Sequence, residues 1–130
     1  MTGLQATSLV INKLVNDSDF VSKLSALGGI PAIISGIVLP SEWDIQTKSV
    51  NIYVVHESMQ TPYYNIRLSA SCRGTTYAES RDIAYALCNV LNRLYDTGLF
   101  IVTTVLQTIE PNDADVYNYN TPVEILVRSS

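Results

Sequence analysis

The residues Tyr63 to Asp96, YYNIRLSASCRGTTYAESRDIAYALCNVLNRLYD, decide the fold of this chain. From Tyr64 to Cys72 apolar residues occupy every second position and polar residues lie between them, which predicts a strand with one buried face. Thr76 and Glu79 then match a capping box, in which the hydroxyl and the carboxylate satisfy free amides of a first helical turn. A helix is therefore predicted to start at Tyr77.

The helix that starts at Tyr77 is predicted to be amphipathic. Asp96-Thr97-Gly98 is expected to end it, because glycine suits the left-handed position after a helix. Its apolar residues recur at three- and four-residue spacing and form one stripe: Ile83, Ala84, Leu87, Cys88, Val90, Leu91 and Leu94.

Length and composition predict a single domain over residues 1–130. With 130 residues, 47% of them hydrophobic, the chain is long enough for one core and too short for two. The net charge is −4 and the eight basic residues are scattered, whereas a dedicated nucleic-acid-binding protein brings several Lys and Arg together on phosphates. The start lacks a signal-peptide pattern and no apolar run approaches a membrane span, so we expect a soluble chain made inside the cell.

Two helical stretches are predicted before residue 30. Thr7 or Ser8 is expected to cap a first helix, whose apolar stripe continues up to Asn16. A second, short helical stretch is predicted over Asp17 to Leu27, and Gly28-Gly29 is expected to end it as a cap.

The remaining elements are predicted to be strands. A short strand is expected around Ile33 to Leu39, followed by a loop over residues 41–49. Val50 to His56 is predicted to pair with the strand from Tyr64 as one hairpin, and Leu99 to Ile109 with Val123 to Arg128 as a second. This order predicts an α+β fold: a mostly antiparallel sheet of two hairpins, packed on one face by the long central helix and the N-terminal helix.

The sequence offers no motif for catalysis. His56 and Glu57 are adjacent in a predicted strand, so their side chains are expected on opposite faces rather than in one site. Cys72 and Cys88 are predicted to be two core thiols, with a disulfide or a metal pair as the alternative. We expect neither an enzyme nor a cofactor.

One pattern imitates a calcium loop. Asp113, Asp115 and Glu124 occupy positions one, three and twelve of such a loop. The fifth and sixth positions are Tyr117 and Asn118, so a ligand and the turn glycine are missing. A solvated turn is the prediction, and no metal is expected.

Two features favour an interaction protein. The Leu99 to Ile109 strand has neither a charge nor a proline to block pairing at a sheet edge, so the edge is either covered within the fold or used by a neighbour. Tyr outnumbers Phe eight to two, and tyrosines suit surfaces that become dry on assembly, although packing on the core is the equal alternative. The tyrosines in question are Tyr53, Tyr63, Tyr64, Tyr117 and Tyr119.

Four segments carry a resemblance to a known family: Val50 to Tyr53, Tyr63 to Arg73, the helix start Thr76 to Arg81 with its Tyr77-Ala78-Glu79, and Leu87 to Asn92. In this order they resemble the tail terminator and minor capsid proteins of long-tailed bacteriophages. The likeness in element order covers roughly residues 7–128, and residues 30–49 depart from it.

The resemblance implies a virion protein assembled in the host cytoplasm. It would form a ring, usually a hexamer, that caps the tail tube, ends its polymerisation and presents a docking surface to a head-completion or connector protein. DNA would pass through the lumen without specific binding, which suits an acidic subunit. The loops at 42–49 and 111–120 are expected to reach neighbouring subunits or partners. The residues expected in such contacts are Trp43, Asp44, Lys48, Tyr53, Tyr63, Asp113, Asp115, Tyr117 and Tyr119.

Two other functions stay open at this point. A head-completion or neck protein would use the same surfaces. A small regulatory or ligand-binding α+β domain is the alternative from a different class, and it would need a compact polar pocket.

Overall fold

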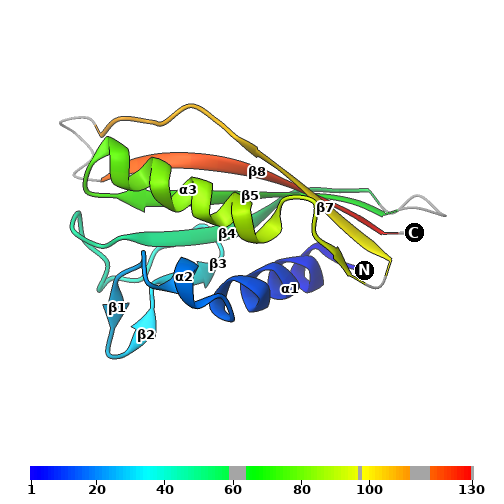
Figure 1. Ribbon diagram of the computed structural model, residues 1–130, viewed down its shortest axis with the longest axis horizontal. Coiled ribbons are helices and arrows are strands. Elements are labelled where there is room, and N and C mark those ends of the chain that lie inside the picture. Colours follow the sequence, from blue (N-terminus) through cyan, green and yellow to red (C-terminus); the bar gives the residue numbers. More distant parts are fainter. Residues whose placement is uncertain (59–63, 97, 112–117, 130) are drawn as a thin grey trace.

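The computed structural model describes residues 1–58, 64–96, 98–111 and 118–129. β4, β5, β8 and β7 are the long strands of one sheet, β3 and β6 are short strands at its margins, and β1 and β2 form a separate hairpin (Figure 1). Along the chain the elements are α1 (Gly3–Val15), α2 (Ser18–Val21), β1 (Ala26–Leu27), β2 (Ile30–Pro31), β3 (Ile33–Ser35), β4 (Ser49–Ser58), β5 (Tyr64–Gly74), α3 (Tyr77–Leu91), β6 (Tyr95–Asp96), β7 (Leu99–Val105) and β8 (Tyr119–Ser129).

The main sheet, as far as the structure describes the chain, has six strands in the order β3-β4-β5-β8-β7-β6. β3 runs parallel to β4, and the other neighbouring pairs are antiparallel. Both predicted hairpins, β4–β5 and β7–β8, are present. The predicted α+β fold is confirmed, with the difference that β3 makes the sheet mixed.

Both long helices cover the same face of the sheet (Figure 1). α3 packs on β5, β8 and β7, and α1 packs beside it on β4, β3 and β5. The core lies between the helices and the sheet, and its fully buried side chains include Leu14, Ile52, Leu68, Leu87 and Ile125. No helix of the described residues covers the other face.

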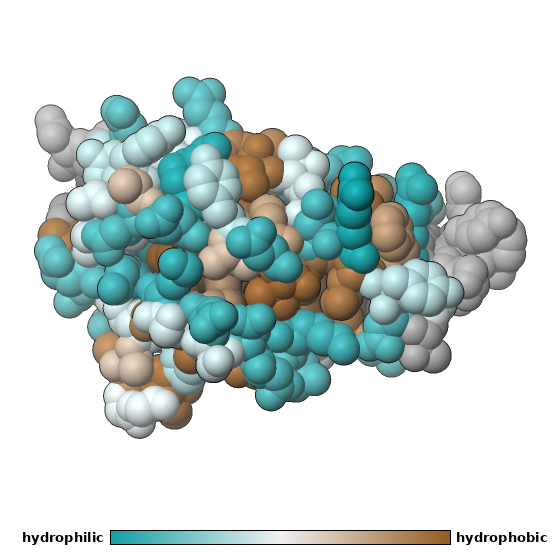
Figure 2. Space-filling model, in the orientation of Figure 1, coloured by the Kyte–Doolittle hydropathy of each residue, from teal (hydrophilic) through white to brown (hydrophobic). Residues whose placement is uncertain are grey.

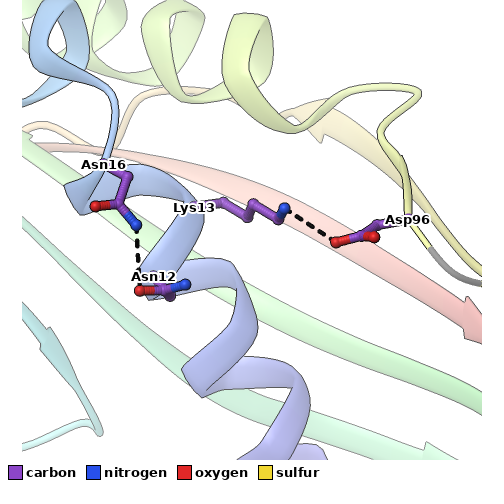
Figure 3. A network of polar contacts seen from close by, with 4 residues as sticks. All are labelled: Asn12, Lys13, Asn16 and Asp96. Carbon is purple, nitrogen blue, oxygen red and sulfur yellow. Dashed lines mark hydrogen bonds and ion pairs between the residues drawn. The ribbon is translucent and has the colours of Figure 1, made fainter.

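An ion pair joins the helix layer to the sheet margin. Lys13 Nζ on α1 lies 3.0 Å from Asp96 Oδ2 on β6 (Figure 3). One turn further along α1, the Asn16 side-chain amide donates to Asn12 Oδ1 at 3.3 Å. Both side chains of the ion pair are more than a third exposed, so its contribution to stability is small, about 0–1 kcal/mol.

The stretch from Tyr63 to Asp96 folds largely as predicted. β5 alternates as expected, and its inward apolar side chains are buried against α3. Thr76 caps α3, with its Oγ1 accepting from the amide of Glu79 at 3.2 Å. The Glu79 carboxylate, however, accepts a hydrogen bond from the Thr75 hydroxyl rather than from a free amide.

The predicted end of the central helix is wrong. α3 ends at Leu91, and Arg93 takes a left-handed conformation with φ of 63°. The cause is long-range pairing, because the amide of Arg93 and the carbonyl of Leu94 bond to both backbone groups of Ile101 on β7. Gly98, with φ of 82°, belongs to the connection between β6 and β7 rather than to a helix cap.

The predicted start of the first helix is also wrong. Thr2 caps α1, and Thr2 and Gln5 form a reciprocal capping box. Thr7 lies inside the helix instead, where its buried hydroxyl donates to the carbonyl of Gly3 at 2.8 Å. The Thr2–Gln5 pair is itself a capping-box sequence, and it accounts for the earlier start.

The region after α2 forms a hairpin that the sequence analysis missed. α2 ends at Val21, and the chain enters β1 because the amide of Ser25 donates to the Lys48 carbonyl at 2.8 Å. Gly28 and Gly29 form the two-residue turn between β1 and β2, with φ of 63° and 81°, which is the turn that such a hairpin favours. The interpretation of this pair as a helix cap was therefore wrong, and Leu27 is exposed rather than inward.

Three predicted strands also have different ends in the structure. β3 ends at Ser35 instead of Leu39, and Gly36 follows with φ of 116°. β7 ends at Val105 instead of Ile109, which forms only an isolated bridge to Asn120. β8 begins at Tyr119 instead of Val123, so part of the expected loop at 111–120 belongs to the sheet. In the described residues no helix is long and apolar enough to cross a membrane.

Candidate functional site

Exposed apolar residues gather on the β1–β2 hairpin and on the loop of residues 36–48. Large hydrophobic side chains here are mostly exposed to solvent in the single chain, with Val38 at 87% and Ile37 at 72%. Figure 2 shows apolar surface on the hairpin, at the lower left. Contiguous exposed apolar residues of this kind mark interaction surfaces. The set comprises Leu27, Ile30, Ile37, Val38 and Ile45.

Two hollows lie on either side of Trp43. The first, which we call the Trp43 cleft, has a volume of about 440 Å³ and is lined by Ile37, Leu39, Pro40, Trp43, Asp44, Ser49, Arg73 and Asn118. The second has a volume of about 550 Å³ and lies between the loop and the β1–β2 hairpin, with Trp43 and Pro40 shared by both. Volumes of this size accommodate a small ligand or a few side chains of a partner.

Local hydrogen bonds shape the loop that forms one wall of the cleft. The amide of Asp44 donates to Thr47 Oγ1 at 2.9 Å, and Asp44 Oδ1 accepts from the amide of Gln46 at 2.8 Å and from Thr47 Oγ1 at 3.2 Å. Side-chain oxygens of Asp and Thr commonly make such turns. The Asp44 carboxylate is therefore already engaged within its own loop.

A long-range hydrogen bond fixes this loop against the sheet. Asn118, which is buried and precedes β8, donates from Nδ2 to the carbonyl of Thr47 at 2.8 Å. Ser25 adds a second anchor, because its hydroxyl accepts from the amide of Lys48 at 2.8 Å. Of the two loops that the sequence singled out, the first, 42–49, thus meets Asn118 of the second at this cleft.

The inner part of the cleft is polar. Ser49 is 1% exposed, and its hydroxyl has no hydrogen-bond partner among the described residues. Arg73 lines the same cleft and donates from Nε to Asn51 Oδ1 at 3.5 Å. Asn51 in turn donates to the carbonyl of Gly36 at 3.2 Å, which ties the start of the loop to the sheet. A buried hydroxyl without a partner carries a free-energy cost that a ligand hydrogen bond would remove.

The structure brings only two of the predicted contact residues together here, Trp43 and Asp44. Lys48 lines a different, smaller hollow of about 170 Å³, together with Lys23, Glu79 and Asp82. Four other predicted residues lie outside the described residues: Tyr63, Asp113, Asp115 and Tyr117.

The last two predicted contact residues lie on the sheet. Tyr53 on β4 is half-buried and lies opposite Ser69, on the face that the helices leave uncovered. Tyr119 begins β8 opposite Gly74 and is also half-buried. Neither lines the Trp43 cleft, so their predicted contacts stay predictions.

The uncovered sheet face is a second exposed surface. Arg67 Nε on β5 and Glu124 Oε1 on β8 form a 3.3 Å ion pair on it. Phe100 and Val102 alternate with the core residues of β7 and are exposed on the same face. The face is therefore mixed in character, with charged and apolar side chains exposed together.

His56 and Glu57 behave as the alternation predicts. Glu57 pairs with the buried Ile66 and accepts a hydrogen bond from the amide of Gly3, at the start of α1. His56 pairs with Arg67, on the uncovered face. The carboxylate suits its position, because a helix N-terminus attracts negative charge.

No disulfide joins Cys72 and Cys88: Cys72 is a buried core thiol, as predicted, and Cys88 is half-buried. Burial raises the pKa of the Cys72 thiol, and the nearby Cys88 adds to the shift. Burial also raises the pKa of Cys88, with the Thr103 hydroxyl opposing it. The described residues hold no group of three or more His, Cys, Asp or Glu that could bind a metal, and the calcium-like Asp113 and Asp115 lie outside them.

The sequence is matched by no family model and by no curated protein. One solved chain, from a structure described as "Virion of native gene transfer agent (GTA) particle", has a similar fold with a TM-score of 0.50 and 14% sequence identity. The match covers 97% of this chain and 92% of that chain. A likeness at this identity shows the fold, and it extends over nearly the whole of both chains.

Sequence reasoning missed most of the cleft. Ser49, Arg73 and Asn118 are far apart in the chain, and only pairing in the sheet brings them together. One signal was available: Ile37 and Val38 follow Gly36 and precede Pro40, so this apolar run could not continue as a buried strand.

Proposed function

We propose that this chain is a structural virion protein of a tailed phage or a phage-like particle. The observation that supports this most is the match in fold to a chain of a gene transfer agent virion, over 97% of this chain and 92% of that one. The exposed apolar surface around Trp43 also supports an assembly role, because such a surface is sheltered only within a complex.

Within the particle, we propose the tail terminator role. The chain forms a ring, a hexamer by the resemblance of its central segments, that caps the tail tube and docks on the head connector. The net charge of −4 supports a lumen through which DNA slides without being held. This role needs no catalytic residue, and our proposal includes that the protein is not an enzyme.

A head-completion or neck protein is the second candidate. The fold match supports this role as much as the terminator role, because the description of the matched structure names the particle and not a position within it. The two roles differ in the contact with the tube, since a terminator binds tube protein as well as the head connector, whereas the neck role requires the connector contact alone.

Tube polymerisation in the presence of the purified chain tests the terminator role. Tail tube protein is polymerised alone and with increasing amounts of the chain, and tube lengths are measured by electron microscopy. We expect shorter tubes with the chain at one end. Tubes of unchanged length with no bound chain would contradict the terminator role, and binding to isolated connectors instead would favour the neck.

A further inference from the structure

We propose that the free chain forms a two-fold dimer in which the outer edge of β7 pairs with the same edge of a second copy. Val105 of one copy then lies opposite Val105 of the other. The inference goes beyond the proposed ring, because neighbours around a ring meet through two unlike surfaces, whereas a two-fold contact uses the same surface twice.

β7 is the last long strand before the margin of the sheet, and the chain itself covers only part of its outer edge (Figure 1). The N–H and C=O of Ile101 bond to Leu94 and Arg93 at 3.0 and 2.8 Å. The amide of Thr103 donates to Asn92 Oδ1 at 3.1 Å. The Asn92 side chain thus takes the place of a neighbouring strand at Thr103, and the cover ends there.

Beyond Thr103 the edge is open. β7 and β8 pair without a bulge from Leu99 to Val105, so every second residue of β7 directs its backbone groups away from β8. Ile101 and Thr103 belong to this set, and so does Val105. Among the described residues, neither backbone group of Val105 has a hydrogen-bond partner, and the Thr103 carbonyl has none either. Unpaired groups of this kind form a template for an added strand.

β7 lacks the features that keep an edge strand from pairing. Leu99 to Ile109 contains neither a charged residue nor a proline. The opposite margin differs, because β4 has an irregular register between Val54 and His56 and the charged Glu57 follows. Bulges and charges discourage pairing between edges. β4 of another copy is therefore a less suitable partner for β7 than β7 itself.

The open edge of β7 complements itself. With Val105 opposite Val105 in an antiparallel pair, the N–H of each copy donates to the carbonyl of the other, and each Thr103 carbonyl faces the amide of Gln107. The same register places Thr104 opposite Leu106. All of these pairs are uncharged, whereas like charges opposite each other would destabilise the contact. Two chains that each carry a net charge of −4 thus meet here without local repulsion.

Exposed apolar side chains flank the open edge on both faces. Val102 and Leu106, at 36% and 42% exposure, lie on the face that the helices leave uncovered. On the other face Tyr85 of α3 is 48% exposed, and Arg81 links it to the edge by donating to the Tyr85 hydroxyl at 3.2 Å and to the Leu106 carbonyl at 2.8 Å. A second copy paired at β7 brings its own apolar side chains against these, and their burial adds to the backbone bonds.

A proline at Val105 tests the contact. Val105→Pro removes the outward N–H and leaves the bonds to β8, since an edge strand tolerates proline where the N–H faces solvent. Sedimentation equilibrium of the chain without tube protein, from about 1 μM to 1 mM, measures dimerisation, and circular dichroism checks the fold. We expect a wild-type dimer whose Kd rises at least about tenfold in Val105→Pro. The matched control, Val38→Pro in the exposed loop, should leave the Kd unchanged.

Cysteine substitutions test the register. The Cα atoms of directly opposed residues lie about 4.5–5.5 Å apart, which a disulfide can span. On oxidation, we expect Val105→Cys chains to link to one another, and Thr104→Cys chains to link to Leu106→Cys chains in a mixture. Two copies of Val102→Cys would lie roughly 20 Å apart at about 3.3 Å per residue, so this control on the same strand should not link to itself. Mass spectrometry identifies the links.

Three results would overturn the inference. The first is a wild-type chain that stays monomeric, or that passes from monomer to ring without a dimer. The second is a dimer that Val105→Pro leaves unchanged, and a loss caused by Val38→Pro instead would assign the contact to the loop. The third is self-linking of Val102→Cys as strong as that of Val105→Cys. None of them decides the proposed function, because the ring is measured separately in the presence of tube protein.

Discussion

The side-chain amide of Asn118 donates a 2.8 Å hydrogen bond to the backbone carbonyl of Thr47, across 71 residues of sequence. Both residues are buried, at 8% and 5% exposure. The bond holds the loop that carries Trp43 against the start of β8. The shape of the cleft therefore depends on a contact that neither loop could form alone.

Replacing Asn118 by Ala is expected to destabilise the chain by about 1–3 kcal/mol, because the Thr47 carbonyl would lose its buried donor. Urea denaturation measures this difference. Asn12→Ala is the matched control, since it removes an exposed side-chain bond on α1 and should change the free energy of unfolding by less than about 0.5 kcal/mol. Equal effects of both substitutions would contradict the assigned role of Asn118.

A buried hydroxyl chain gives a second prediction. Thr121 Oγ1 lies 2.9 Å from Ser80 Oγ on α3 and 2.7 Å from Thr108 Oγ1. Thr121→Val keeps the side-chain shape and removes both bonds, so we expect a loss of about 1–3 kcal/mol by urea denaturation. Thr104→Val, at an exposed position on β7, should be nearly neutral. A neutral Thr121→Val would show that the chain of hydroxyls contributes nothing to stability.

The sequence predicts the elements whose signals are local. Three predictions depend only on residues close together in the sequence, and all three are confirmed: the alternation of β5, the N-cap at Thr76 and the apolar stripe of α3. The hairpin partners of β5 and β7 follow from the same alternation, because a strand with one buried face needs a neighbour.

Predictions failed where distant parts of the chain decide. α3 ends at Leu91, five residues before the predicted end at Asp96, because Arg93 and Leu94 pair with Ile101. The residues next to Leu91 give no local signal for this end. Gly28-Gly29 supports either a helix cap or a hairpin turn, and the pairing of Ser25 with Lys48 selects the turn. The cleft itself is assembled from strand ends, so its polar residues could not be grouped from sequence.

Leu87→Ala tests the packing of α3 on the sheet. Leu87 is fully buried, and its truncation is expected to cost about 2–5 kcal/mol through lost burial and the cavity left behind. Thermal or urea denaturation measures the change, and Leu4→Ala on the exposed side of α1 should be almost silent. A loss below about 1 kcal/mol would mean that α3 is not packed as described.

Alkaline pH is expected to lower the free energy of unfolding through the buried thiol of Cys72. Its buried thiol has a raised pKa in the folded chain, whereas the unfolded thiol ionises above about pH 8.5. The unfolded state then binds fewer protons, so the free energy of unfolding falls as pH rises, by up to about 1.4 kcal/mol per pH unit for this thiol. Denaturation curves from pH 7 to 10 should show a shallower decline in Cys72→Ala. Identical slopes in both proteins would contradict the burial of this group.

The mass of the assembled species tests the central claim, a ring-forming virion protein, most directly. Native mass spectrometry is applied to the purified chain alone and after incubation with tail tube protein. We expect a closed species of about six times the 14.3 kDa chain mass, formed alone or on the tube. A strict monomer at every concentration, with and without tube protein, would contradict the ring and with it the proposed function.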